Sequence, residues 1–153
     1  MNLQGTRLTP EIGVEEVDHL FSVKGLRVFL PGGYGAIGEA IAIAMGRMGA
    51  VVAIAGPRRE RAEALAARIG ESGGTAHGFE IDAREVASIS AATAEAVARM
   101  GGIDVLVNCV GIQREQKLLE VTEEAFDDLY RTNLKSAMFL AQGGIPPLML
   151  VLV

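Results

Sequence analysis

The sequence predicts an α/β fold, a doubly wound parallel sheet in three layers, α/β/α. Strand and helix patterns alternate along residues 23–142. The strand patterns are short and apolar on both faces, which is typical of strands that helices cover on both sides. Because parallel strands are joined by right-handed crossovers, this alternation favours a doubly wound topology. Four strands are expected in this sheet.

The first strand, residues 26–30, leads into a glycine-rich turn and then a helix over residues 37–48. We expect one apolar face on this helix, made of Ile37, Ala40, Ile41, Ala44 and Met45. Gly49 closes the helix as its C-terminal cap. The second strand, residues 51–55, is apolar throughout.

Pro57 opens the second helix, where its missing N–H has no cost, and the helix reaches Gly70. A third strand is expected over residues 76–81, a third helix over 85–100 and a fourth strand over 103–107. Thr122 is the expected N-cap of a fourth helix that ends near Gln142. Residues 1–22 are interpreted as an N-terminal extension, and residues 143–153 as an atypical apolar tail.

Composition restricts the possible partners and compartments. With 153 residues, the chain has the length of one domain. A net charge of −5 with only three lysines argues against binding to nucleic acid. The single cysteine cannot form an internal disulfide, and the acidic first twenty residues do not resemble a signal peptide, so a cytoplasmic location is expected. No apolar run approaches the roughly 20 residues that span a membrane, and we single out no metal site.

Residues 28–38 contain the motif that points most directly to a ligand. A strand ends in glycines and a helix follows at once, with Gly33-x-Gly35-x-x-Gly38 between them. Glycines permit a sharp turn and a close approach to a ligand, and the start of the helix favours an anion. This pattern fits a dinucleotide fingerprint. The alternatives are a tight turn without ligand and a nucleoside triphosphate loop, but Glu39 stands where that loop needs lysine.

The end of the second strand indicates which dinucleotide is preferred. NAD sites carry an acidic residue here for the ribose hydroxyls. This chain has Gly56, Pro57, Arg58 and Arg59 instead. Two guanidinium groups without a carboxylate favour a 2′-phosphate, so NADP(H) is favoured over NAD(H). In the alternative interpretation, the two arginines only solvate the first turn of a helix.

The run from Lys24 to Gln142 resembles the short-chain dehydrogenase/reductase family, which has a Rossmann-like fold. Its glycine loop is similar to the family's Thr-Gly-x-x-x-Gly-Ile-Gly, with a proline and an alanine as departures. The resemblance assigns the whole loop to the cofactor: Gly32, Gly33, Tyr34, Gly35, Ala36, Ile37 and Gly38.

Three further motifs carry the resemblance. Asp82 looks like the family aspartate that contacts the adenine amine, with the backbone of Ala83 beside it. The segment from Asn108 through Val110 to Gly111 resembles the family's Asn-Asn-Ala-Gly, so Asn108 would steady the sheet and the other two would follow the cofactor. Asn133 matches the catalytic asparagine whose backbone carbonyl holds a water of the proton relay.

Asp82, Asn108 and the neighbouring Cys109 also have purely structural interpretations. Asp82 can cap the next helix, and Asn108 can form a turn. Cys109 is interpreted as a small buried hydrophobe rather than a nucleophile, because neither histidine lies in a motif that would activate it.

The family's catalytic serine and Tyr-x-x-x-Lys pair are not found in this chain. Tyr34 is followed four residues later by Gly38, and Tyr130 by Leu134. We therefore interpret the chain as the cofactor-binding half of an NAD(P)-dependent oxidoreductase that interconverts small-molecule ketones and secondary alcohols, and expect it to be inactive as it stands.

The resemblance also implies that the sheet is incomplete and that the fourth strand is an unprotected edge. It implies in addition that the longer parent is a homo-oligomer. A non-catalytic dinucleotide-binding module is the alternative. An S-adenosylmethionine-dependent methyltransferase is less favoured, because Gly56 replaces the acidic residue that it needs.

Overall fold

The core of the molecule is a five-stranded, wholly parallel sheet. A computed structural model describes residues 21–143 and 149–152. The strands lie in the order β3-β2-β1-β4-β5. Their bounds are β1 Arg27–Pro31, β2 Val51–Gly56, β3 Thr75–Glu80, β4 Val105–Asn108 and β5 Met149–Leu152.

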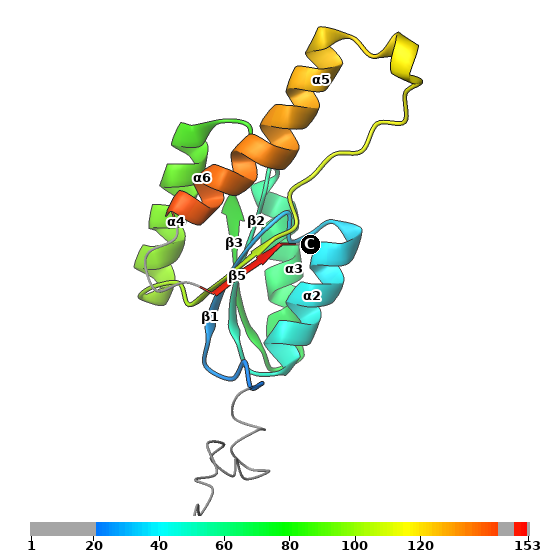
Figure 1. Ribbon diagram of the computed structural model, residues 1–153. Helices are drawn as coiled ribbons and strands as arrows, with labels where there is room; N and C mark the ends of the chain where they lie inside the picture. Colours follow the sequence, from blue (N-terminus) through cyan, green and yellow to red (C-terminus); the bar gives the residue numbers. More distant parts are fainter. Residues whose placement is uncertain (1–20, 144–148, 153) are drawn as a thin grey trace, which may run out of the picture.

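Helices cover both faces of this sheet, as Figure 1 shows. Four of the helices are α2 Ala36–Arg47, α3 Arg59–Glu71, α4 Val86–Met100 and α6 Ser136–Gly143. Alternate strand residues face two separate cores. Val28 and Leu30 lie in the core that α2 and α3 cover, whereas Phe29 lies in the core that α4 and α6 cover. The predicted three-layer, doubly wound fold is confirmed, and the four expected strands are all present within about two residues of their predicted bounds.

The predicted apolar face of α2 is correct only in part, because Ile41 and Met45 are partly buried against the core and the other three residues are not. Ile37 is 61% exposed, and Ala40 and Ala44 are exposed too. The helix instead buries Gly38, Ala42 and Gly46, which recur every four residues. Almost every residue of this helix is apolar, so periodicity could not choose a face. The smallest residues face the sheet because the helix lies very close to its neighbours there.

The start of α3 also differs from the prediction. Its N-cap is Arg58, so Pro57 precedes the helix rather than opening it. Thr122, in contrast, caps the expected helix, and its Oγ1 accepts a hydrogen bond of 3.2 Å from the amide N–H of Ala125.

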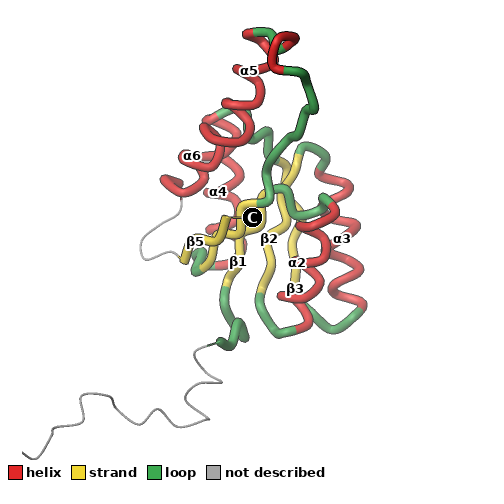
Figure 2. The backbone as a smooth tube through the Cα atoms, turned by 45° about the vertical axis from the view of Figure 1, so that its right-hand side comes forward, coloured by secondary structure: helices red, strands yellow, loops and turns green. Residues whose placement is uncertain are grey.

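The helix that follows Thr122 is not uniform. It consists of α5 (Glu123–Leu129), a π-helix η2 (Tyr130–Lys135) and α6. The segment from β4 to α5 includes the short 3-10 helix η1 (Leu118–Glu120). It rises away from the sheet and returns through α5, η2 and α6, as the tube in Figure 2 shows.

The expectation that β4 would be an unprotected edge is wrong. Residues 149–152 form β5, which pairs in parallel with all four residues of β4. This strand lies within the segment interpreted from the sequence as an atypical apolar tail. Most of the predicted N-terminal extension and residues 144–148 and 153 of the predicted tail lie outside the described residues. Among the described helices none has the length and hydropathy needed to cross a membrane.

Candidate functional site: a cleft at the carboxyl ends of the strands

The turn after β1 lies directly against the end of β4. Gly32 has φ +76°, a conformation that glycine adopts readily. A Cβ atom on Gly32 would lie 2.3 Å from the carbonyl oxygen of Cys109. The turn and the end of β4 are therefore in backbone contact, which only a residue without a side chain allows.

Of the remaining glycines in the loop, Gly33 and Gly38 are closely packed, whereas Gly35 is exposed. Cβ atoms on Gly33 and Gly38 would meet the side chain of Leu30 and the backbone of Gly32 at 2.5 and 2.4 Å. Gly35, in contrast, is exposed and is the N-cap of α2, with no side chain to satisfy the first N–H groups of the helix. Free N–H groups at a helix start are suited to bind a phosphate.

Ala36 and Ile37 begin α2 and are both exposed. Neither lines the cleft described below.

Tyr34 covers the end of β2. Its ring lies against Gly56, where a Cβ atom would be 2.4 Å from Cε1 of the tyrosine. Its hydroxyl accepts a hydrogen bond of 2.8 Å from the amide N–H of Arg58. The guanidinium of Arg61 lies over the ring, 4.7 Å from its centroid, which is a cation–π contact. The end of β2 thus carries an aromatic ring and an arginine and has no carboxylate.

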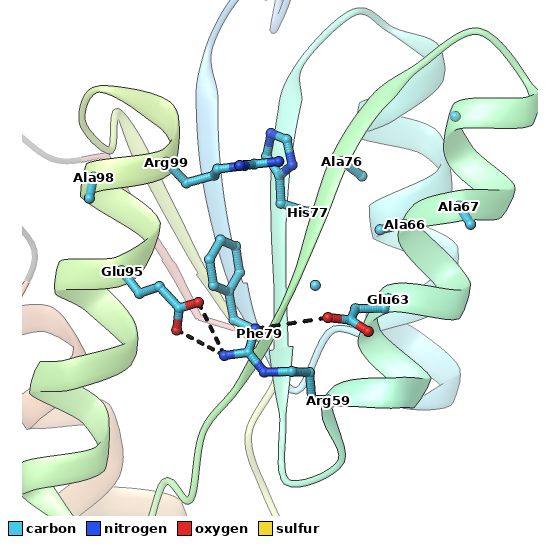
Figure 3. A pocket seen from close by; sticks show the side chains of 12 residues that line it. Arg59, Glu63, Ala66, Ala67, Ala76, His77, Phe79, Glu95, Ala98 and Arg99 are labelled. Carbon is cyan, nitrogen blue, oxygen red and sulfur yellow. Dashed lines mark hydrogen bonds and ion pairs between the residues drawn. The ribbon is translucent and has the colours of Figure 1, made fainter.

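Arg59 does not join this group. Its guanidinium donates hydrogen bonds of 3.1 and 3.0 Å to the carboxylate of Glu95 on α4 and lies 3.9 Å from Glu63. Figure 3 shows these contacts on the outer side of β3. The structure therefore does not bring Arg58 and Arg59 together at one site, as the sequence predicted. The first turn of α3 directs Arg59 toward α4 instead.

Asp82 follows β3 and is bound by an arginine. Arg84 donates from Nε to Oδ1 at 2.9 Å, from a terminal guanidinium nitrogen to Oδ2 at 2.7 Å, and from its amide N–H to Oδ1 at 3.0 Å. These hydrogen bonds hold the pKa of Asp82 below its ordinary value. The N-cap of α4 is Glu85, so the alternative role of Asp82 as a helix cap is not observed.

The end of β4 has a defined turn. The side-chain Oδ1 of buried Asn108 accepts a hydrogen bond of 3.0 Å from the amide N–H of Val110, which is the turn-forming geometry expected of asparagine. Cys109 packs against the core, and burial raises the pKa of its thiol. Gly111 follows and is exposed.

Asn133 holds this segment from the other side. Its Oδ1 accepts a hydrogen bond of 2.8 Å from the N–H of Ile112, and its Nδ2 donates one of 2.9 Å to the carbonyl of the same residue. Asn133 lies within the π-helix η2, and short π-helical segments often occur at functional sites. The side chain of Asn133 therefore fixes the backbone just after the end of β4.

These segments enclose a cleft of about 420 Å³. Eight of the residues predicted from sequence line it: Gly32, Tyr34, Gly35, Gly56, Asp82, Ala83, Val110 and Gly111. Eight lie outside the lining: Gly33, Ala36, Ile37, Gly38, Arg58, Arg59, Asn108 and Asn133. The cleft lies where strands of a doubly wound sheet end on either side of the change in strand order, the usual place for ligands in such folds.

Several lining residues were missed by sequence reasoning. Arg84 holds Asp82, Arg114 and Asp128 form an ion pair, and Thr132 is buried. Arg114 and Asp128 meet only because the chain turns back between β4 and α5, so no local pattern could reveal them. Thr132 directly precedes Asn133, a predicted site residue. This adjacency was the only feature of the sequence that pointed to Thr132.

A larger hollow, of about 780 Å³, lies between α3 and α4 along β3 (Figure 3). Its charged groups include Arg59, Glu63 and Glu95, which bind one another. It lies at the side of the sheet, away from the glycine loop and the end of β4, so the smaller cleft is the better candidate site. No group of three or more residues able to hold a metal ion occurs in the described parts of the chain.

Comparison with known proteins agrees with this geometry. The family model for short chain dehydrogenase matches residues 27–150. D-threitol dehydrogenase of Mycolicibacterium smegmatis is 35% identical over 126 residues, which cover 82% of this chain and 48% of that protein. Sorbitol dehydrogenase of Cereibacter sphaeroides is 36% identical, over 77% of this chain and 45% of that protein. The chain thus spans about half the length of these relatives.

Solved structures show the same relationship. A dehydrogenase/reductase from Sinorhizobium meliloti is 34% identical with a TM-score of 0.76, covering 80% of this chain and 49% of that one. An actinorhodin polyketide ketoreductase variant, solved with NADPH, is 28% identical with a TM-score of 0.74, covering 78% and 46%. With a family model that matches most of its length and a cleft at the expected end of the sheet, this chain belongs to the short-chain dehydrogenase family.

Proposed function

We propose that the chain is the dinucleotide-binding half of an NAD(P)-dependent oxidoreductase, whose parent transfers hydride between the nicotinamide and the carbon of a secondary alcohol or ketone. The observation that carries this proposal is that Gly32 and Gly35, the N-cap of α2, line one cleft together with the end of β4. Such a corner suits a pyrophosphate, because N–H groups are free and side chains are absent. The nicotinamide would supply the hydride chemistry, and the residues described here would hold the other half of the molecule.

NADP(H) is favoured over NAD(H) on the geometry at the end of β2. Gly56 and the Tyr34 ring occupy the place where an acidic residue would bind ribose hydroxyls. Arg61 lies over that ring and forms no ion pair among residues 21–143. We therefore assign the 2′-phosphate to Arg58 and Arg61 rather than to Arg58 and Arg59.

The parent's substrate is a small alcohol or carbonyl compound. Two relatives are named as dehydrogenases of polyols, D-threitol and sorbitol, which makes a polyol a reasonable first substrate to test on a full-length parent. In that parent, the backbone carbonyl of Asn133 would hold a water of the proton relay while its side chain keeps Ile112 in place. Without the catalytic tyrosine and lysine, we expect this chain to bind cofactor and to show no turnover.

Exposed apolar side chains support an oligomeric parent. Phe126, Tyr130, Leu134 and Met138 recur every four residues from α5 to α6, and each is 52–64% exposed. Exposed apolar rows of this kind are typical of surfaces that another segment or subunit covers. We propose that the parent is a homo-oligomer, which light scattering of the full-length parent would test.

The cofactor proposal is tested by titrating the purified chain with NADPH, NADH and S-adenosylmethionine in a calorimeter. NADPH should bind more tightly than NADH, and S-adenosylmethionine should not compete. Tighter binding of S-adenosylmethionine, or no binding of either dinucleotide, would overturn the proposal.

Two arginine variants then test the assignment of the 2′-phosphate. Arg61→Gln should weaken NADPH binding by about five- to tenfold and leave NADH binding unchanged, because it removes a charge-assisted contact. Arg59→Gln is the matched control on the same helix, and it should change neither affinity, since Arg59 binds Glu95. If instead Arg59→Gln selectively weakens NADPH binding, the assignment to Arg61 is wrong.

A further inference from the structure

The hydroxyl of Thr132 is buried without a partner. The residue is 7% exposed, and its Oγ1 is the one buried side-chain nitrogen or oxygen within residues 21–143 that lacks a hydrogen bond. A buried polar atom without a partner lowers stability, and native proteins retain few of them. Such an atom needs an explanation, and here it belongs to a residue that lines the candidate cleft.

The π-helix explains why this hydroxyl is free. Threonine in a regular helix commonly donates to the carbonyl four residues earlier, as Thr93 does to Ile89 at 2.8 Å. Thr132 lies in η2, where the wider turn changes this register. Its own carbonyl accepts a hydrogen bond from the hydroxyl of Ser136, so the backbone is satisfied while Oγ1 is not. The local fold thus leaves a hydroxyl without a partner on a residue that lines the cleft.

We propose that the Thr132 hydroxyl binds the adenosine half of the dinucleotide, an inference that rests on the proposed function. Thr132 lines the same cleft as Gly56 and Tyr34 at the end of β2 and Asp82 and Ala83 after β3. In a doubly wound fold, the ends of the second and third strands hold adenosine. A threonine hydroxyl can donate to a base nitrogen or accept from a ribose hydroxyl, so it suits this half of the ligand.

Replacement of Thr132 by valine separates binding from stability. Val keeps the shape and removes the unpartnered hydroxyl, so Thr132→Val should raise the melting temperature of the ligand-free chain by about 2–4 °C. The same change should weaken binding of NADPH and of adenosine 2′,5′-bisphosphate by about five- to tenfold in calorimetry, because the bound state loses a hydrogen bond. Binding of reduced nicotinamide mononucleotide should not change.

Two variants serve as controls. Thr132→Ser retains the hydroxyl and should keep the NADPH affinity within about twofold of the original chain. Thr93→Val removes a hydroxyl that already has a protein partner, so it should lower the melting temperature and leave the affinity unchanged.

The outcomes distinguish this inference from the function on which it rests. If the unaltered chain binds no dinucleotide, the proposed function itself fails. The inference is overturned and the proposed function stands if the unaltered chain binds NADPH and Thr132→Val does not weaken that binding. The same holds if Thr132→Val weakens only the binding of reduced nicotinamide mononucleotide. A lower melting temperature in Thr132→Val would also overturn it, since the hydroxyl would then have a partner without ligand.

Discussion

Replacing Gly32 by alanine should destabilise the chain far more than the same change at Gly25. The two glycines have nearly the same backbone conformation, with φ +76° and +79°. A residue with a Cβ atom in this conformation lowers the free energy of unfolding by about 1–2 kcal/mol. The reduced conformational freedom of the unfolded chain offsets about 0.4–1 kcal/mol of this loss. Backbone conformation alone therefore predicts a loss of about 1 kcal/mol at either site. A Cβ atom on Gly25 would meet no heavy atom within 4 Å, so nothing adds to that figure.

At Gly32 a second cost adds to the first. The new Cβ would lie 2.3 Å from the carbonyl oxygen of Cys109 and 2.8 Å from the amide nitrogen of Val110. Both are backbone atoms at the end of β4, so no side chain can rotate to make room. Overpacking of this kind costs about 1–3 kcal/mol, which gives a total of about 2–4 kcal/mol for Gly32→Ala.

Urea unfolding followed by far-UV circular dichroism measures both variants. The midpoint should fall much further for Gly32→Ala than for Gly25→Ala, with similar slopes. Calorimetry should in addition show weaker NADPH binding for Gly32→Ala alone, because its contact joins the two walls of the cleft. Equal losses of stability would refute the argument, since they would mean that the turn after β1 and the end of β4 do not touch.

Two further predictions concern side-chain contacts. Asn133→Ala removes both hydrogen bonds to Ile112 and should lower the free energy of unfolding by about 1–2 kcal/mol and speed amide exchange of Ile112, read by mass spectrometry; unchanged exchange would contradict this role. Arg27 binds Asp104 and lowers the pKa of its carboxyl from 3.8 to about 2, so the stabilisation is complete above pH 4 and is lost as the pH falls through 2. Because Asp104 is 31% exposed, we expect about 1 kcal/mol, and urea midpoints of Asp104→Asn should depend less on pH than those of the original chain between pH 4 and 2.

The sheet could be predicted because its signals are local. Strands such as β2 are apolar on both faces and end at glycine or proline, and these features fixed the fold class and the order of elements. The buried face of α2 could be predicted only in part from the same kind of signal. In a helix made almost entirely of apolar residues, contact distance rather than hydropathy decides which side faces the sheet, and Gly38 and Gly46 mark that side.

The candidate site could be predicted where backbone chemistry defines it and not where side chains do. Gly32 and Gly35 were identified because a turn and a helix start need particular residues. The direction of Arg59 depends on Glu95, 36 residues away, and the π-helix at Thr132 has no local signal in the sequence. The edge strand β5 was not expected either, because the apolar residues after two prolines resembled a tail. Its pairing with β4 is a long-range property.

The charges around the cleft explain how an acidic chain can accept an anionic ligand. The chain carries a net charge of −5, which by itself would repel a pyrophosphate. Near the start of α2, however, Arg68 pairs with Glu39 at 2.8 Å. In the cleft, Arg84 pairs with Asp82, and Arg114 pairs with Asp128. Each of these carboxylates is thus neutralised by an arginine, so the uncapped N–H groups of α2 can determine the local potential.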